Sequence, residues 1–204
     1  MRGDKIMRNT SISHRSLRVG TDVQRHLFNV DEYYRLAEAG ILAPDARVEL
    51  IDGEIVEMSA IGSRHAACVD RLNVLLHDRL HGRSILRVQG PVRLNLFSEP
   101  LPDVAVLKPR PDFYASAHPG PADVLLVVEV ADSSLKYDRD IKASLYSRAG
   151  IAEMWLVDLE GQVIHVFTQP SDAGYQRSAT CRRGERVPTL ALGPSELLVD
   201  DILG

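Results

Sequence analysis

The sequence contains little cysteine, few aromatic residues and no long apolar run. Its two cysteines, Cys68 and Cys181, exclude a disulfide framework and a zinc site made of cysteines alone. No stretch approaches the roughly 20 apolar residues that span a bilayer, and residues 1–20 lack a signal-like apolar segment. We therefore expect a cytoplasmic protein with no membrane partner.

Three common catalytic signatures are also missing. The chain has no Gly-rich phosphate loop, no Gly-x-Ser-x-Gly turn and no His-Glu-x-x-His helix. We therefore expect no nucleotide cofactor, no serine-hydrolase site of that type and no zinc-peptidase site of that type.

Charge is unevenly distributed along the chain. There are 24 Lys and Arg residues against 28 Asp and Glu residues, which gives a formal net charge of −4. Residues 1–20 hold five basic residues and one acidic residue, so residues 21–204 carry a more negative net charge than the whole chain. An acidic body argues against coating nucleic acid by bulk electrostatics but allows one local nucleic-acid site.

Residues 1–25 lack apolar periodicity, so we expect a flexible basic tail there, or alternatively a basic arm that contacts phosphates. The remaining residues, 26–204, show no repeat and no linker. We expect them to form a single domain.

Apolar periodicity and turn signals predict the elements of this domain. Helices are expected over residues 31–39 (with Asp31 as a cap), 65–80 and 137–149, and a hairpin over 47–58 with Asp52-Gly53 at its turn. Further strands are expected over residues 85–95, 103–107, 124–130, 153–157 and 162–168, followed by a late hairpin over 175–187. The order indicates an α/β fold with a mixed sheet flanked by helices, an N-terminal hairpin and a C-terminal β extension.

Glu129 interrupts the most apolar stretch of the chain, residues 124–130. A carboxylate inside a buried strand costs several kcal/mol unless it is protonated, paired or bound to a metal. Asp103 opens the strand 103–107, and antiparallel pairing of the two strands would bring both acids together. Mg²⁺ or Mn²⁺ would suit such a pair, and an arginine or backbone amides would be the alternative partner.

Lys142 lies one turn into the helix that follows the Glu129 strand. Its ammonium could orient an attacking water and offset developing phosphate charge. An ordinary surface lysine is the alternative, and Lys136 in the connecting turn is a rival candidate.

Several motifs, taken in order, resemble the Uma-two family of restriction endonucleases in the PD-(D/E)XK nuclease superfamily. These are RVELIDGEIVEMSAIGSRHAACVDRLNVLL, Pro102-Asp103, LLVVEVADSS and YDRDIKASLYSRAGIAEMWLVD. The resemblance covers about residues 27–167 and implies a nuclease core, a divalent metal, nucleic acid (above all DNA) as partner, and a homodimer.

The resemblance also implies roles for individual residues. Asp103 and Glu129 would ligate the metal with the backbone carbonyl of Val130. The superfamily places its lysine two residues after the second acid, where this chain has Ala131. The family pattern moves the lysine to the next helix, which points to Lys142.

Three further residues match the family pattern. Glu49 would add a third carboxylate to the metal site, or form a salt bridge with an arginine. His65 would bind phosphate, shuttle a proton or simply lie near a helix start, and Gln89 would bind water or phosphate, or be a plain strand residue. Tyr146 is expected to pack in the core.

Two functions follow from these residues. The first is a metal-dependent endonuclease that hydrolyses phosphodiester bonds with Mg²⁺ or Mn²⁺. The second is a catalytically inactive nuclease-fold module that binds nucleic acid or a protein partner, which Ala131 and the acidic body would favour.

Overall fold

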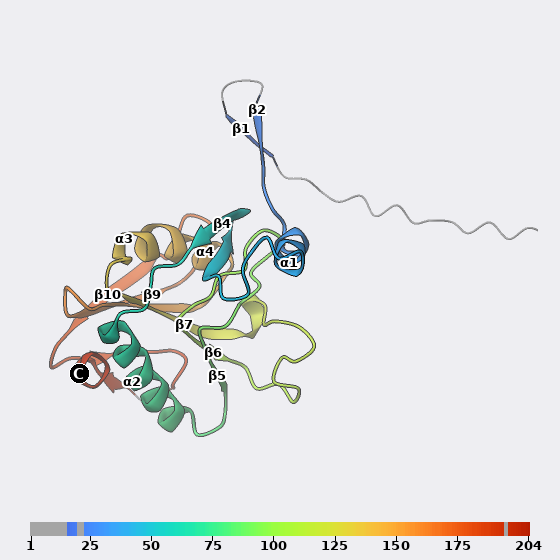
Figure 1. The fold of residues 1–204 in the computed structure, drawn as a ribbon. Coiled ribbons are helices and arrows are strands. Elements are labelled where there is room, and N and C mark those ends of the chain that lie inside the picture. Colours follow the sequence, from blue (N-terminus) through green and yellow to red (C-terminus); the bar gives the residue numbers. More distant parts are fainter. Residues whose placement is uncertain (1–15, 20–22, 194–195) are drawn as a thin grey trace, which may run out of the picture.

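A six-stranded mixed sheet forms the centre of the molecule (Figure 1). The structure, a computed structural model, describes residues 16–19, 23–193 and 196–204. In spatial order the strands are β10 (Arg177–Arg182), β9 (Val163–Thr168), β8 (Glu153–Asp158), β7 (Val124–Ala131), β6 (Val104–Leu107) and β5 (Ile85–Val88). β7 and β8 run parallel, and the other neighbouring pairs are antiparallel. The predicted α/β fold with a mixed sheet is confirmed.

β7 is buried because helices cover both faces of the sheet (Figure 1). Successive side chains of a strand point to opposite faces. Accordingly, Val128 belongs to the apolar cluster that contains the buried residues of α2 (Ser63–Leu80), and Val127 belongs to the cluster that contains Tyr146 of α4 (Ala143–Arg148). Glu129 therefore shares the face of Val127 and α4.

The predicted N-terminal hairpin is present as β3 (Val48–Ile51) and β4 (Glu54–Glu57). The helix before it, α1 (Val30–Glu38), is capped by Asn29 and not by Asp31 as predicted. The Asn29 side chain accepts a hydrogen bond from the backbone of Glu32, whose side chain accepts one from the backbone of Asn29. This reciprocal capping box satisfies two amides at once and sets the helix start.

The helical segment after β7 is less regular than the single helix predicted over residues 137–149. It consists of α3 (Leu135–Tyr137), one π-helical turn named η2 (Asp138–Lys142) and α4. Single π turns inside helices are frequent at functional sites. Both ends of this turn, Asp138 and Lys142, are buried.

Two predicted strand segments need correction. β5 ends at Val88 instead of residue 95, because Gln89 adopts a positive φ of 47° and Pro91 has no amide hydrogen to donate. The late hairpin over 175–187 is also wrong. β10 pairs with β9, while β11 (Arg186–Val187) pairs with β12 (Leu197–Leu198), which is followed by α5 (Val199–Leu203).

The segment predicted as a flexible tail contains a pair of antiparallel strands in its described part. These are β1 (Ser16–Val19) and β2 (Val23–His26), which stand apart from the sheet in Figure 1. The sequence did not indicate these strands; residues 1–15 and 20–22 lie outside the described residues. In the described part of the chain, no helix is both long and apolar enough to cross a membrane.

Candidate active site

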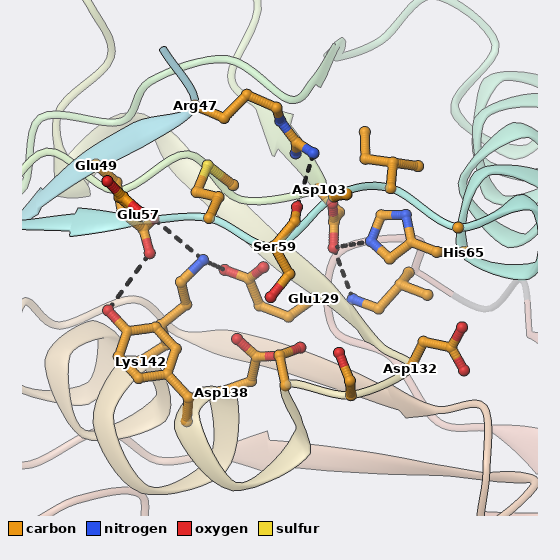
Figure 2. Close-up of a pocket in the computed structure, with 18 of the residues that line it drawn as sticks. Arg47, Glu49, Glu57, Ser59, His65, Asp103, Glu129, Asp132, Asp138 and Lys142 are labelled. Carbon is orange, nitrogen blue, oxygen red and sulfur yellow. Dashed lines mark hydrogen bonds and ion pairs between the residues drawn. The ribbon is translucent and has the colours of Figure 1, made fainter. Parts of the chain in front are cut away.

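Asp103 and Glu129 lie beside each other on adjacent strands, as the sequence predicts. In the antiparallel register of β6 and β7, Val104 faces Val128, so Asp103 immediately before Val104 comes opposite Glu129. Both acids line a cavity of about 420 Å³ between the β3–β4 hairpin, the start of α2 and the α3–η2 segment (Figure 2). The fold thus brings together two carboxylates that lie 26 positions apart in the sequence.

Asp103 is held by three hydrogen-bond donors. Its Oδ2 contacts the Nε2 atom of His65 at 3.0 Å (Figure 2) and accepts from the amide of Val130 at 2.9 Å. Its Oδ1 accepts from the Gln89 side chain at 3.3 Å. Burial alone would raise the pKa of this carboxyl group, but these donors outweigh it and lower the pKa. Asp103 is therefore ionised and fixed in position.

His65 lies in the first turn of α2 and is mostly buried. The hydrogen bond with Asp103 raises its pKa, despite a smaller opposing effect of burial. Its Nδ1 atom is buried and has no hydrogen-bond partner among the described residues. The imidazole therefore orients Asp103 through its other nitrogen.

Glu129 has a different environment. Its side chain is 3% exposed, and its Oε1 lies 3.2 Å from the Lys142 ammonium and accepts a hydrogen bond of 2.6 Å from the Tyr146 hydroxyl. Burial raises the pKa of Glu129 well above its ordinary value, and Lys142 opposes this only in part. The carboxyl groups of Asp138 and Asp103 raise it further. Glu129 thus lies where an additional cation would be favourable.

Lys142 bridges two acids, and so the structure places this side chain inside the predicted site (Figure 2). Its Nζ atom lies 3.2 Å from Glu49 and 3.2 Å from Glu129. Burial alone would lower the pKa of Lys142, but the two carboxylates raise it above its ordinary value. The ammonium therefore keeps its proton at neutral pH.

Glu49 reaches the cavity from β3 but contacts Lys142 instead of an arginine. Its Oε2 accepts from the backbone amide of Leu101 at 3.1 Å, and its Oε1 accepts from the Tyr137 hydroxyl at 3.4 Å. Both oxygens of Glu49 are therefore engaged, and its direct effect is to hold the ammonium next to Glu129.

The residues that could hold a metal are Asp103, Glu129 and the carbonyl of Val130. In a strand, the amide and carbonyl of one residue point to the same side, and the Val130 amide points to Asp103. Within the described residues, no three His, Cys, Asp or Glu side chains converge closely enough to form a metal cage. Mg²⁺ commonly binds through one or two carboxylates and keeps several waters, so this smaller donor set fits it.

Two tyrosines and one acid in the site were not predicted as functional. Tyr146 was expected only to pack, yet its hydroxyl bonds Glu129, and Tyr137 bonds Glu49 in the same way. Asp138 is buried and lines the cavity, where burial raises its pKa. Asp138, Lys142 and Tyr146 follow one another at intervals of four residues, a spacing that places side chains on one side of a helix.

Comparison with known proteins gives one family and one fold. A family model named Uma2, described as putative restriction endonuclease, matches residues 30–198. The fold is similar to the crystal structure of a putative nuclease belonging to DUF820 from Anabaena variabilis. That match has a TM-score of 0.67 at 15% identity and covers 86% of this chain and 97% of the other. No curated protein matches the chain.

Proposed function

Because the chain belongs to the Uma2 family of putative restriction endonucleases, we propose that it is a metal-dependent endonuclease that cleaves phosphodiester bonds in DNA. The observation that carries the proposal is the pairing of Asp103 with Glu129 across β6 and β7, on the wall of a cavity. Two copies would serve the two strands of a duplex, which is the reason to expect a homodimer.

Asp103, Glu129 and the Val130 carbonyl would hold Mg²⁺ or Mn²⁺. When bound, such an ion polarises the phosphoryl oxygen and lowers the pKa of a bound water. The raised pKa of Glu129 supports this assignment, because a second cation would stabilise the ionised carboxylate.

Lys142 would act as a fixed positive charge instead of a base, because its pKa is raised and it keeps its proton. An ammonium held in a buried site stabilises the negative charge that develops on phosphate in the transition state. Glu49 holds that ammonium in place through its own contact of 3.2 Å. The lysine thus reaches the second acid from the helix, although Ala131 occupies the usual position of the superfamily lysine.

His65 and Gln89 would position Asp103. Each donates to a different oxygen of its carboxylate, so together they fix the orientation in which it presents its remaining lone pairs. Groups of this kind around a metal ligand commonly change affinity or activity by 10- to 100-fold when they are removed.

Cleavage of supercoiled plasmid DNA with Mg²⁺ or Mn²⁺ tests the proposal. Glu129→Gln, Asp103→Asn and Lys142→Met are each expected to lower the rate by about 100-fold or more. Asp140→Asn is the matched control, because Asp140 lies on the same helical turn but is exposed and pairs with Arg139. Its rate should equal that of the wild type.

A folded wild-type protein that cleaves neither DNA nor RNA with either metal would contradict the endonuclease. That result would instead favour the inactive nuclease-fold module that binds nucleic acid or a protein. Thermal melts of each variant confirm that a lost rate is not a lost fold.

A further inference from the structure

A second cavity, of about 530 Å³, lies beside α1 and outside the candidate active site. Its volume is within the range of small-molecule sites in proteins. It is lined by side chains of α1, by Arg93 and by the segment 114–118. None of these residues takes part in the proposed reaction, so the cavity needs its own explanation.

Aromatic rings form part of its wall. The rings of Tyr34 and His118 are nearly parallel, with an interplanar angle of 22° and centroids 6.4 Å apart. The guanidinium of Arg93 lies over the Tyr34 ring, 5.6 Å from its centroid. Aromatic faces combined with arginine are the groups on which unpaired nucleobases stack.

The buried side chain of Glu99, a residue that is 1% exposed, holds Tyr34 and Arg93 of this wall in place. The Tyr34 hydroxyl donates to one Glu99 oxygen at 2.6 Å, and Arg93 donates to the other at 2.6 Å. Because both partners share one buried carboxylate, the ring and the guanidinium are held in a fixed relation before any ligand arrives. Preorganised groups lose less entropy when a ligand binds.

The rim of the cavity offers groups for the polar edge of a base. Asp31 and Glu38 supply hydrogen-bond acceptors, while Arg35 supplies donors. Donors and acceptors of both kinds suit a nucleobase, whose edge carries both.

The residue that supports the cavity wall, Glu99, is close in sequence to Asp103 of the candidate active site. Glu99 is four residues from Asp103, and an extended segment of four residues spans at most about 14 Å. The same segment is tied to β3, because the Glu99 amide donates to Leu50 and the Leu101 amide donates to Glu49. The backbone of Glu99, whose side chain holds the aromatic wall, therefore lies within about 14 Å of the backbone of Asp103.

We infer that the Tyr34–His118 cavity binds a nucleobase that is unstacked from the nucleic-acid strand whose phosphodiester bond lies at Asp103 and Glu129. The inference rests on the proposed nuclease function and extends it by adding a base-stacking subsite. The cavity would then act in substrate choice by favouring strands from which a base is easily released.

The test is fluorescence titration of a short single-stranded DNA that contains 2-aminopurine, in EDTA so that no cleavage occurs. Stacking on the wall should quench the fluorescence, and His118→Ala should weaken binding by at least about fivefold. His118→Phe keeps an aromatic face and should restore most of the affinity.

His165→Ala is the matched control, because His165 has a ring neighbour, Phe167, at the same centroid distance of 6.4 Å but does not line this cavity. It should bind like the wild type. Equal affinity of wild type and His118→Ala, or no quenching at all, would overturn the inference. Free 2-aminopurine nucleoside should bind far more weakly than the strand. Equal binding of the two would contradict the claim that the bound base belongs to a nucleic-acid strand.

This test is independent of cleavage. Glu129→Gln should lose cleavage and keep the quenching. If the wild type quenches but never cleaves, the base subsite stands and the proposed nuclease activity fails. If it cleaves without quenching, the nuclease stands and the base subsite fails.

Discussion

Asp103 and Glu129 are both buried, yet their surroundings move their pKa values in opposite directions. Asp103 receives three hydrogen bonds from His65, Gln89 and the Val130 amide, which favour its ionised form. Glu129 shares one ammonium with Glu49 and faces other acids. The site therefore contains one carboxylate that is already stabilised as an anion and one carboxyl group whose ionised form a further cation would stabilise.

Tyr146 is expected to be a positioning residue for Glu129. Tyr146→Phe keeps the ring but removes the donor 2.6 Å from Glu129, so Mn²⁺ affinity should fall about 10-fold. Isothermal titration with Mn²⁺ measures the change.

Tyr175→Phe is the control, since its hydroxyl donates to the Ile151 carbonyl and does not reach the acids. It should change the free energy of unfolding but not the Mn²⁺ affinity. Equal losses of affinity in both variants would show that the effect of Tyr146 is merely structural.

The His65–Asp103 pair predicts a pH dependence of stability in EDTA. Because the folded-state pKa of His65 is raised above 6.5, the contribution of its charged form is fully present below pH 6.5. That contribution is lost as the pH rises through the folded-state pKa. As the pH rises from about 5.5 to 8.5, thermal melts should show the wild type losing stability relative to His65→Gln. Parallel curves for the two proteins would contradict a stabilising contact between charged His65 and Asp103.

Among individual residues, the sequence predicted the two acids and Lys142 better than the side chains that form hydrogen bonds with them. Glu129 is conspicuous because a charge in an apolar strand needs a reason, and strand pairing then indicates Asp103. Tyr146 carries no comparable signal, because a tyrosine on a helix face usually packs. Its hydrogen bond depends on how α4 lies against β7, which the local sequence does not show.

The β3–β4 hairpin holds Glu49 in the site, and its turn depends on Gly53. Gly53 has a φ of +87°, and a Cβ built there would lie 2.6 Å from the Cβ of Leu27. The residue is therefore required both for its backbone conformation and for the close approach of the chain before α1.

Gly53→Ala should destabilise the fold more than Gly82→Ala does. Gly82 also has a positive φ, of +73°, but a Cβ added there would meet no atom within 4 Å. Both variants lose about 1–2 kcal/mol of stability through backbone strain. In Gly53→Ala the close contact with Leu27 costs about 1–3 kcal/mol more. Urea unfolding compares the two, and equal losses would show that the close approach is unimportant.

A hairpin with a clear turn signal was predictable, and a strand with a distant partner was not. The Asp52-Gly53 turn joins strands that pair with each other, so the hairpin was predicted correctly. Val187 pairs with Leu197 instead of with the strand just before it. No local pattern shows such a partner, and so the late hairpin was wrongly predicted.

In the molecule as a whole, the segment 99–103 links the two cavities. Glu99 anchors the aromatic wall, and Asp103 supplies an acid of the candidate active site. The fold class could be predicted because the central strand and its flanking helices have clear patterns. The second cavity could not, because it is formed by α1 and the segment 114–118, which only tertiary packing brings together.

A metal site coupled to the fold should raise the melting temperature. With free Mn²⁺ at about 100 times its Kd, the stabilisation is about 2.7 kcal/mol, which corresponds to a shift of about 5–10 °C in a chain of this size. Asp103→Ala should remove the shift, and Asp140→Asn should retain it. A shift that persists in Asp103→Ala would place the bound ion elsewhere.

The most direct measurement is anomalous diffraction from crystals soaked in Mn²⁺. The pairing of β6 and β7 predicts a single strong peak bound by both Asp103 and Glu129, adjacent to the Val130 carbonyl. A fully soaked crystal with no peak between these two carboxylates, or with its peak on other residues, would contradict the metal site on which the proposed endonuclease depends.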